Sequence, residues 1–173
     1  MFKSLQDKKP IKILFICSGN IMRSPMAEML FEKLFTEKYG EKWRERITVA
    51  SGGVRFKNSQ IFPGTREVLL SEGIPEQRIA KFKPRHIENH PDLFAEADVI
   101  IAMTEGQVKR LLNYEPRYSS KTTLLKKFVS DGRPIPDPWF SLRRKKALQE
   151  VKETILDGLE GLMKEIEGNR IIQ

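Results

Sequence analysis

The residues best suited to chemistry lie in one short stretch of the sequence, CSGNIMRS, which runs from Cys17 to Ser24. Cys17 is the only cysteine, so it cannot form a disulfide within the chain, and its thiolate could act as a nucleophile. Arg23 follows six residues later, and its planar guanidinium can hold two oxygens of a phosphoryl group. This combination of a thiolate and a charged fork predicts attack on a phosphate monoester.

The backbone between Cys17 and Ser24 is expected to bind a phosphate-like anion. It joins an apolar segment to the start of an amphipathic one, so several N–H groups and the positive end of a helix dipole would face one point. That field also favours a thiolate over a thiol. Gly19 allows close approach of the backbone, Asn20 tolerates a left-handed conformation, and Ser24 can donate to the sulfur. The predicted phosphate-binding loop contains Ser18, Gly19, Asn20, Ile21, Met22 and Ser24.

The alternative interpretation is a buried cysteine that only packs, because free cysteine is commonly a small core residue. An arginine six positions after a cysteine is weak evidence, since average composition gives that pairing on the order of one time in twenty. The longer pattern C-S-G-N-x-x-R-S-P-x-A-E lies between an apolar and an amphipathic segment, and this context argues against a purely structural cysteine.

A thiolate that attacks a phosphate monoester needs an acid to protonate the leaving oxygen. Asp137 is the candidate, because Pro136 and Pro138 restrict the backbone on both sides of it. Trp139 and Phe140 follow directly and could wall a pocket. An Asp-Pro pair alone is more often a surface turn, so the assignment depends on the cysteine loop.

The segments around these residues alternate between strand and helix patterns. Strands are predicted at residues 11–17, 46–53, 97–103 and 122–129, and helices at 25–40, 65–74, 104–112 and 141–168. Apart from Lys12, segment 11–17 is apolar, as in a strand buried on both faces. The alternation predicts an α/β fold of three layers, with a small four-stranded parallel sheet flanked by helices and the phosphate loop after the first strand. Ligands of such sheets lie at the carboxyl ends of the strands, where Cys17 stands.

Length and composition predict one domain over residues 11–173, preceded by a flexible basic extension at 1–10. The extension does not resemble a signal peptide, and no apolar run reaches the roughly 18 residues of a membrane helix. The net charge of +8 favours anionic partners, although a solvated basic face is an equally good interpretation. We expect no nucleic acid or membrane partner, a cytoplasmic location, and no metal, because His86 and His90 lack a third ligand.

The strings CSGNIMRSPMAE and DPWF resemble the low-molecular-weight protein tyrosine phosphatase family, and the similarity extends through VASGG, LLSEGI and EADVIIAM. The resemblance implies that Cys17 is the nucleophile, Arg23 binds phosphate, and Asp137 is the general acid. It also implies a phosphocysteine intermediate, no cofactor and a tyrosine-phosphorylated protein as substrate. The aromatic wall that the family places near the pocket falls on Phe56, Trp139 and Phe140.

Two positions separate this chain from its chemical rivals. Many family members carry a second cysteine where Met22 stands, and arsenate reductases of similar fold need further thiols, so that reduction is not expected here. Protein arginine phosphatases of the family tend to carry threonine where Ile21 stands, and an apolar side chain better suits the ring of phosphotyrosine. Two alternatives stay open: an arginine phosphatase of the same fold, and a module that binds phosphoproteins without turnover. A monomer or weak dimer is expected.

Overall fold

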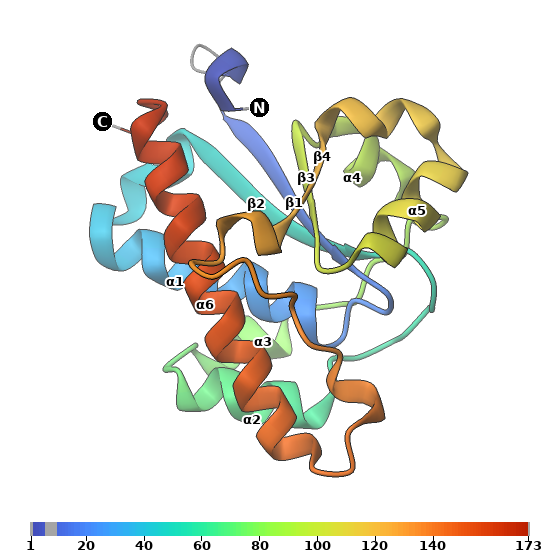
Figure 1. Ribbon diagram of the computed structural model, residues 1–173. Coiled ribbons are helices and arrows are strands. Elements are labelled where there is room, and N and C mark those ends of the chain that lie inside the picture. Colours follow the sequence, from blue (N-terminus) through green and yellow to red (C-terminus); the bar gives the residue numbers. More distant parts are fainter. Residues whose placement is uncertain (1, 6–9, 173) are drawn as a thin grey trace.

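The structure, a computed structural model, describes residues 2–5 and 10–172 of the chain. Its centre is a sheet of four parallel strands in the order β2-β1-β3-β4, which confirms the predicted fold class (Figure 1). The strands are β1 (Ile11–Cys17), β2 (Ile47–Gly53), β3 (Val99–Ala102) and β4 (Thr122–Leu124).

Helices cover both faces of the sheet (Figure 1). They are α1 (Arg23–Tyr39), α2 (Pro63–Ser71), α3 (Glu76–Ala80), α4 (Pro91–Glu96), α5 (Glu105–Tyr114) and α6 (Arg144–Gly168). Short 3-10 helices occupy Phe2–Leu5, Glu41–Glu45, Pro116–Lys121, Leu125–Phe128 and Pro138–Phe140. The helices and the sheet together form three layers.

Strand β1 is apolar from Ile13 to Cys17 because each of its faces packs into a different core cluster. Ile13 and Phe15 belong to the cluster formed with α1, α2 and α6, whereas Leu14 and Ile16 belong to the cluster formed with α4 and α5. β2 pairs with one edge of β1 and β3 with the other, so the order in which strands are added to the sheet switches sides at β1. The residue at the carboxyl end of β1 is Cys17, which therefore lies at the switch in strand order.

Most element boundaries differ from the sequence prediction by one to three residues, and the largest difference is in the fourth strand. The strand predicted at 122–129 ends at Leu124, and Leu125–Phe128 forms a 3-10 helix. The apolar run continues there because Leu125 is buried against α6, where a Cβ added at Gly158 would lie 3.0 Å from the Leu125 side chain. Burial against a helix and burial in a strand produce the same pattern in so short a run. The last helix begins at Arg144 and not at residue 141.

The N-terminal segment is partly packed on the domain. Phe2 is buried in the core cluster of α1 and α6, and Phe2–Leu5 forms a 3-10 helix. Residues 1 and 6–9 lie outside the described part of the chain, so flexibility of the extension stays a prediction. None of the helices in the described ranges combines the length and apolar character needed to cross a bilayer.

Candidate active site

The loop between β1 and α1 directs hydrogen-bond donors at the sulfur of Cys17. Cys17 is 3% exposed. Its Sγ accepts hydrogen bonds from the backbone N–H of Asn20 at 3.2 Å and from the hydroxyl of Ser24 at 3.0 Å. Donors stabilise negative charge on an acceptor, so these two groups are placed to hold an anionic sulfur. The predicted donor Ser24 is in place, and Asn20 supplies a second donor through its backbone.

The backbone and the buried side chain of Asn20 both fix the conformation of the loop. Its backbone φ is +54°, in the left-handed region where asparagine is one of the few tolerated residues with a side chain. The side chain is completely buried, and its Nδ2 donates to Ser24 Oγ at 3.0 Å and to Ser51 Oγ at 2.8 Å. Its Oδ1 accepts from the backbone N–H of Arg85 at 2.8 Å. Asn20 and Ser24 are thus buried members of the loop that do not line the cavity, and they fix the shape of the loop.

A buried carboxylate continues this network, and sequence reasoning missed it. Ser51 donates its hydroxyl proton to Glu28 Oε2. The Glu28 side chain is 5% exposed and is balanced by two guanidinium groups, Arg78 at 2.6 Å and Arg85 at 2.7 Å. The available sequence signal was Glu28 itself, a charged residue near the start of a helix whose first turns are otherwise buried. The partners of Glu28 come from other elements and carry no local signal.

The structure brings Arg23 and Asp137 together although 114 residues separate them. Arg23 is 4% exposed, and its Nη2 forms an ion pair with Asp137 Oδ2 at 2.9 Å. Its Nη1 is buried and has no hydrogen-bond partner among the described residues. Asp137 Oδ1 accepts from the backbone N–H of Trp139 at 3.1 Å, which fixes the carboxylate at the start of the 3-10 helix. A buried guanidinium with one unused donor is suited to an oxyanion.

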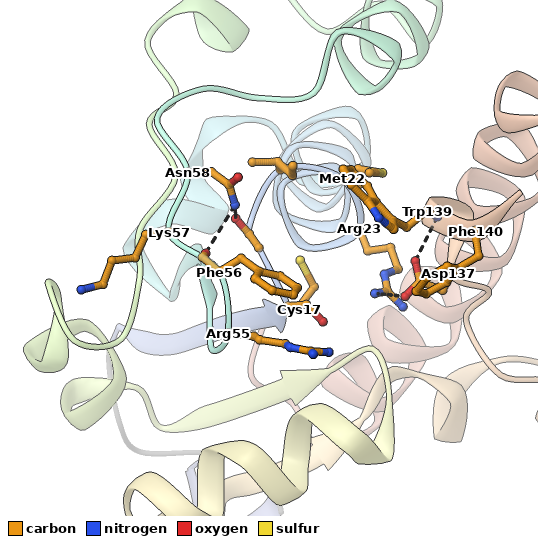
Figure 2. A pocket seen from close by; sticks show the side chains of 13 residues that line it. Cys17, Met22, Arg23, Arg55, Phe56, Lys57, Asn58, Asp137, Trp139 and Phe140 are labelled. Atoms are coloured by element: carbon orange, nitrogen blue, oxygen red, sulfur yellow. Dashed lines mark hydrogen bonds and ion pairs between the residues drawn. The ribbon is translucent and has the colours of Figure 1, made fainter.

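These residues surround a cavity of about 560 Å³ (Figure 2). The lining residues are Cys17, Ser18, Gly19, Ile21, Met22, Arg23, Arg55, Phe56, Lys57, Asn58, Asp137, Trp139 and Phe140. Figure 2 shows Trp139 and Phe140 on the side of Asp137, whereas Phe56 comes from the segment that follows β2. All three predicted aromatic residues therefore lie on the cavity wall. Phe140 is 85% exposed, so it forms part of the rim.

The segment after β2 supplies cavity residues that sequence reasoning did not identify: Arg55, Lys57 and Asn58. The backbone N–H groups of Arg55 and Phe56 donate to Ser18 O, and Asn58 Nδ2 donates to Gly19 O at 2.8 Å. The Arg55 guanidinium lies 4.6 Å from the centre of the Phe56 ring. These contacts attach the segment to the phosphate loop. No local pattern marks them, because their role depends on the loop that they contact.

Gly53, at the end of β2, explains how the loop can approach this strand so closely. A Cβ at this position would lie 3.2 Å from the carbonyl carbon of Gly19 and 3.3 Å from the backbone nitrogen of Asn20. Contacts this short are tighter than nearly all contacts of a real Cβ, so the loop would have to shift by a few tenths of an ångström to admit a side chain here. The close approach of the loop therefore favours glycine at Gly53, the second glycine of the string VASGG.

The two histidines lie apart from the cavity wall. His86 is 7% exposed, and burial lowers its pKa below the ordinary value of 6.5. His90 precedes α4 and is exposed. The described residues contain no group of three or more His, Cys, Asp or Glu side chains that could hold a metal ion.

Comparison with known proteins agrees with this geometry. The family described as low molecular weight phosphotyrosine protein phosphatase matches residues 12–171. The chain belongs to this family. A protein-arginine-phosphatase of Geobacillus stearothermophilus is 33% identical over 155 residues, which cover 87% of this chain and 94% of that protein. The low molecular weight protein-tyrosine-phosphatase YfkJ of Bacillus subtilis is 32% identical over 91% of this chain and 96% of its own length.

Solved structures of the family have the same fold. The crystal structure of YfkJ matches with a TM-score of 0.79 and 28% identity, and covers 95% of this chain and 99% of its own. The arginine phosphatase YwlE, in a mutant that carries a phosphorylated active-site serine in place of cysteine, matches with a TM-score of 0.75 and 26% identity over 92% of this chain and 98% of its own. Enzymes named for tyrosine and for arginine thus share this architecture.

Proposed function

We propose that the protein is a cysteine-dependent protein tyrosine phosphatase that hydrolyses phosphotyrosine monoesters through a phosphocysteine intermediate. The observation that carries the proposal is the meeting of three groups around one cavity: the sulfur of Cys17, the carboxylate of Asp137, and Arg23 Nη1, which no described residue hydrogen-bonds. A nucleophile, an oxyanion fork and a proton donor are the parts that this reaction requires.

In the first step the Cys17 thiolate attacks phosphorus in line with the leaving phenolic oxygen. The S–P bond forms as the P–O bond to the tyrosine ring breaks, while Arg23 and the loop amides hold the non-bridging oxygens. The neutral carboxyl of Asp137 gives its proton to the phenolic oxygen, and the dephosphorylated tyrosine leaves. The products of this step are a phosphocysteine and an ionised Asp137.

In the second step water hydrolyses the phosphocysteine. Ionised Asp137 accepts a proton from the water, whose oxygen attacks phosphorus as the S–P bond breaks, and inorganic phosphate is released. The Ser24 hydroxyl and the Asn20 N–H, which donate to Sγ at 3.0 and 3.2 Å, stabilise the returning thiolate. The phosphorylated serine at the active site of the YwlE mutant supports a covalent route for this loop.

The walls of the cavity favour an aromatic substrate side chain. Ile21, Phe56 and Trp139 offer apolar surface to a phenyl ring. Arg55 lines the same cavity, and it forms no ion pair with the described residues, so its positive charge would oppose the cationic group of phosphoarginine. The identity of 33% with an arginine phosphatase supports the competing hypothesis, a protein arginine phosphatase that uses the same two steps.

Further expectations of the sequence belong to this proposal. A lone thiol that acts as nucleophile suits a reducing compartment, so we place the protein in the cytoplasm. A monomer or weak dimer without a nucleic acid or membrane partner remains the expected state. The mechanism uses no metal, because Arg23 and the loop amides bind the phosphoryl oxygens.

Turnover of matched phosphopeptides tests the proposal. Phosphotyrosine, phosphoarginine and phosphoserine peptides are compared without added metal, in the wild type and in Cys17→Ser, Asp137→Asn and Asp131→Asn. We expect selective phosphotyrosine hydrolysis that Cys17→Ser abolishes and Asp137→Asn slows by roughly 10² to 10⁴. Asp131 caps the backbone N–H of Arg133 outside the cavity, so Asp131→Asn serves as the matched control with unchanged turnover.

The other outcomes distinguish the alternatives. Preference for phosphoarginine keeps the mechanism and replaces the substrate. Tight binding of phosphotyrosine peptide without turnover of any substrate favours the non-catalytic binding module. Equal loss in Asp137→Asn and Asp131→Asn would refute the role of Asp137 as the acid.

A further inference from the structure

Exposed apolar side chains concentrate beside the catalytic cavity. Among the described residues, the large hydrophobic side chains with the greatest exposure are Leu142 at 104% and Phe140 at 85%, and Trp139 is 50% exposed. These residues follow Asp137 on the segment that leads into α6. Trp139 and Phe140 also line the cavity, so this apolar surface is continuous with the place where a substrate side chain must enter (Figure 2).

A run of four cations follows this apolar surface directly. Arg143 is the residue before α6, and Arg144, Lys145 and Lys146 are the first three residues of the helix, whose first turn contains no acidic residue. Cations at this end of a helix oppose the helix dipole, so their placement does not serve the stability of α6. Repulsion among the four positive charges also disfavours the folded start of the helix.

The chain supplies little negative charge to balance the run. Among the described residues Arg143, Arg144 and Lys145 form no ion pair, and Lys146 contacts Glu150 only at 3.9 Å. The Arg144 guanidinium instead lies 5.5 Å from the Trp139 ring centre, which links the basic run to the cavity wall. Arg144 and Lys145 also line a second hollow of about 290 Å³ between α2 and α6.

We propose that Trp139–Lys146 is a docking surface for an acidic segment of the phosphoprotein substrate, on one side of the phosphotyrosine. This inference rests on the proposed function, because Trp139 and Phe140 line the cavity that would hold the phosphotyrosine at Cys17, and one flank of the substrate chain would leave the cavity over them. Apolar contact with Trp139, Phe140 and Leu142 and charge complementarity with the basic run together select a substrate in which acidic residues neighbour the tyrosine. Substrate specificity then resides partly outside the phosphate loop.

Two pairs of phosphotyrosine peptides test this surface. In each pair one peptide carries three glutamates on one flank of the phosphotyrosine and the other carries three glutamines, with the flank exchanged between pairs. The readout is the ratio of kcat/KM for the glutamate peptide to that for the glutamine peptide. The variants are Arg143→Gln/Lys145→Gln and the control Lys42→Gln/Lys164→Gln, which removes two exposed cations elsewhere. Removal of cations from the start of α6 does not endanger folding.

The expected ratio in the wild type is about 3 to 10 for one flank, since exposed charge pairs contribute modestly and several act together. The ratio falls toward one in Arg143→Gln/Lys145→Gln and with added salt, and it is retained in the control. A ratio near one in the wild type, or equal loss in both variants, overturns the docking surface.

Two further outcomes separate the docking surface from the proposed function and from membrane binding. Turnover of the glutamine peptides without any acidic preference refutes the docking surface alone, whereas no turnover of any phosphotyrosine peptide refutes the proposed function and the docking surface with it. Sedimentation with phosphatidylserine vesicles is measured in parallel. Vesicle binding that Arg143→Gln/Lys145→Gln abolishes, together with an unchanged peptide ratio, would assign the surface to a membrane and overturn the proposal.

Discussion

Replacement of Asn20 separates two contributions to the phosphate loop, the left-handed backbone and the buried amide. The residue has a φ of +54° and is fully buried. Asn20→Gly keeps access to that backbone conformation and removes the amide. Asn20→Ala removes the same amide and also places an ordinary Cβ in the left-handed region. The two variants therefore share one loss and differ in the other.

The magnitude follows from the hydrogen bonds of the side chain. Asn20 makes three of them, at 3.0 Å to Ser24, 2.8 Å to Ser51 and 2.8 Å from the backbone N–H of Arg85. At about 0.5–1.5 kcal/mol net for each, Asn20→Gly should lower the free energy of unfolding by about 1.5–4.5 kcal/mol. Asn20→Ala should lose about 1–2 kcal/mol more, because of the strained backbone.

Urea unfolding followed by circular dichroism measures both values from the midpoint at constant slope. Asn89 is the matched control, since it is exposed and its φ is not positive, so alanine there should be at least as stable as glycine. An equal loss in Asn20→Gly and Asn20→Ala would refute the backbone argument. A loss below about 1 kcal/mol in Asn20→Gly would refute the hydrogen-bond argument. Weaker turnover in Asn20→Ala than in Asn20→Gly should accompany the stability order.

Three further outcomes are expected. Burial lowers the pKa of His86 below its ordinary value of 6.5, so between the folded and the unfolded pKa the unfolded chain binds more protons than the folded one. The free energy of unfolding should therefore fall as the pH drops through 6.5. His86→Gln, compared with the wild type by urea unfolding at several pH values, should lack this part of the pH dependence. A Cβ at Gly161 would clash with the carbonyl group of Phe128, so Gly161→Ala should destabilise by about 1–3 kcal/mol in thermal unfolding, whereas Gly168→Ala, with open space around it, should not destabilise. Peroxide should inactivate the protein by oxidising Cys17, the only cysteine. Thiol reductants should restore less activity the longer the peroxide treatment lasts, because sulfinic acid forms and cannot be reduced by thiols. Full recovery after long treatment, measured by activity and intact mass, would contradict this.

Local signals in the sequence determined the first strand, the loop and the helix after it. The apolar run of β1 is long enough to require burial on both faces, and the structure places its residues in two core clusters. The cysteine, glycine, asparagine and arginine of the loop are residue types that suit a phosphate-binding turn between a strand and a helix. Such signals are readable because the residues that interact are close in the chain.

The capping of α5 was equally local. The helix predicted at 104–112 begins at Glu105, and Gln107 Oε1 accepts a hydrogen bond from the backbone N–H of Thr104 at 3.1 Å, three residues away. The strand predicted at 122–129 shows the limit of local patterns. Its apolar residues are buried, as predicted, but Leu125–Phe128 packs on α6 as a 3-10 helix, and only the position of α6 decides between these two structures.

Tertiary structure alone decided how the site is held together. The pairing of Arg23 with Asp137 spans 114 residues, and the pairing of Glu28 with Arg78 and Arg85 joins separate elements. Arg55 became a cavity residue only because the segment after β2 folds onto the phosphate loop. The sequence by itself determined which groups can react, because that depends on residue type and short spacing. The charge and shape around them depend on which distant segments pack together, and that is a property of the folded chain.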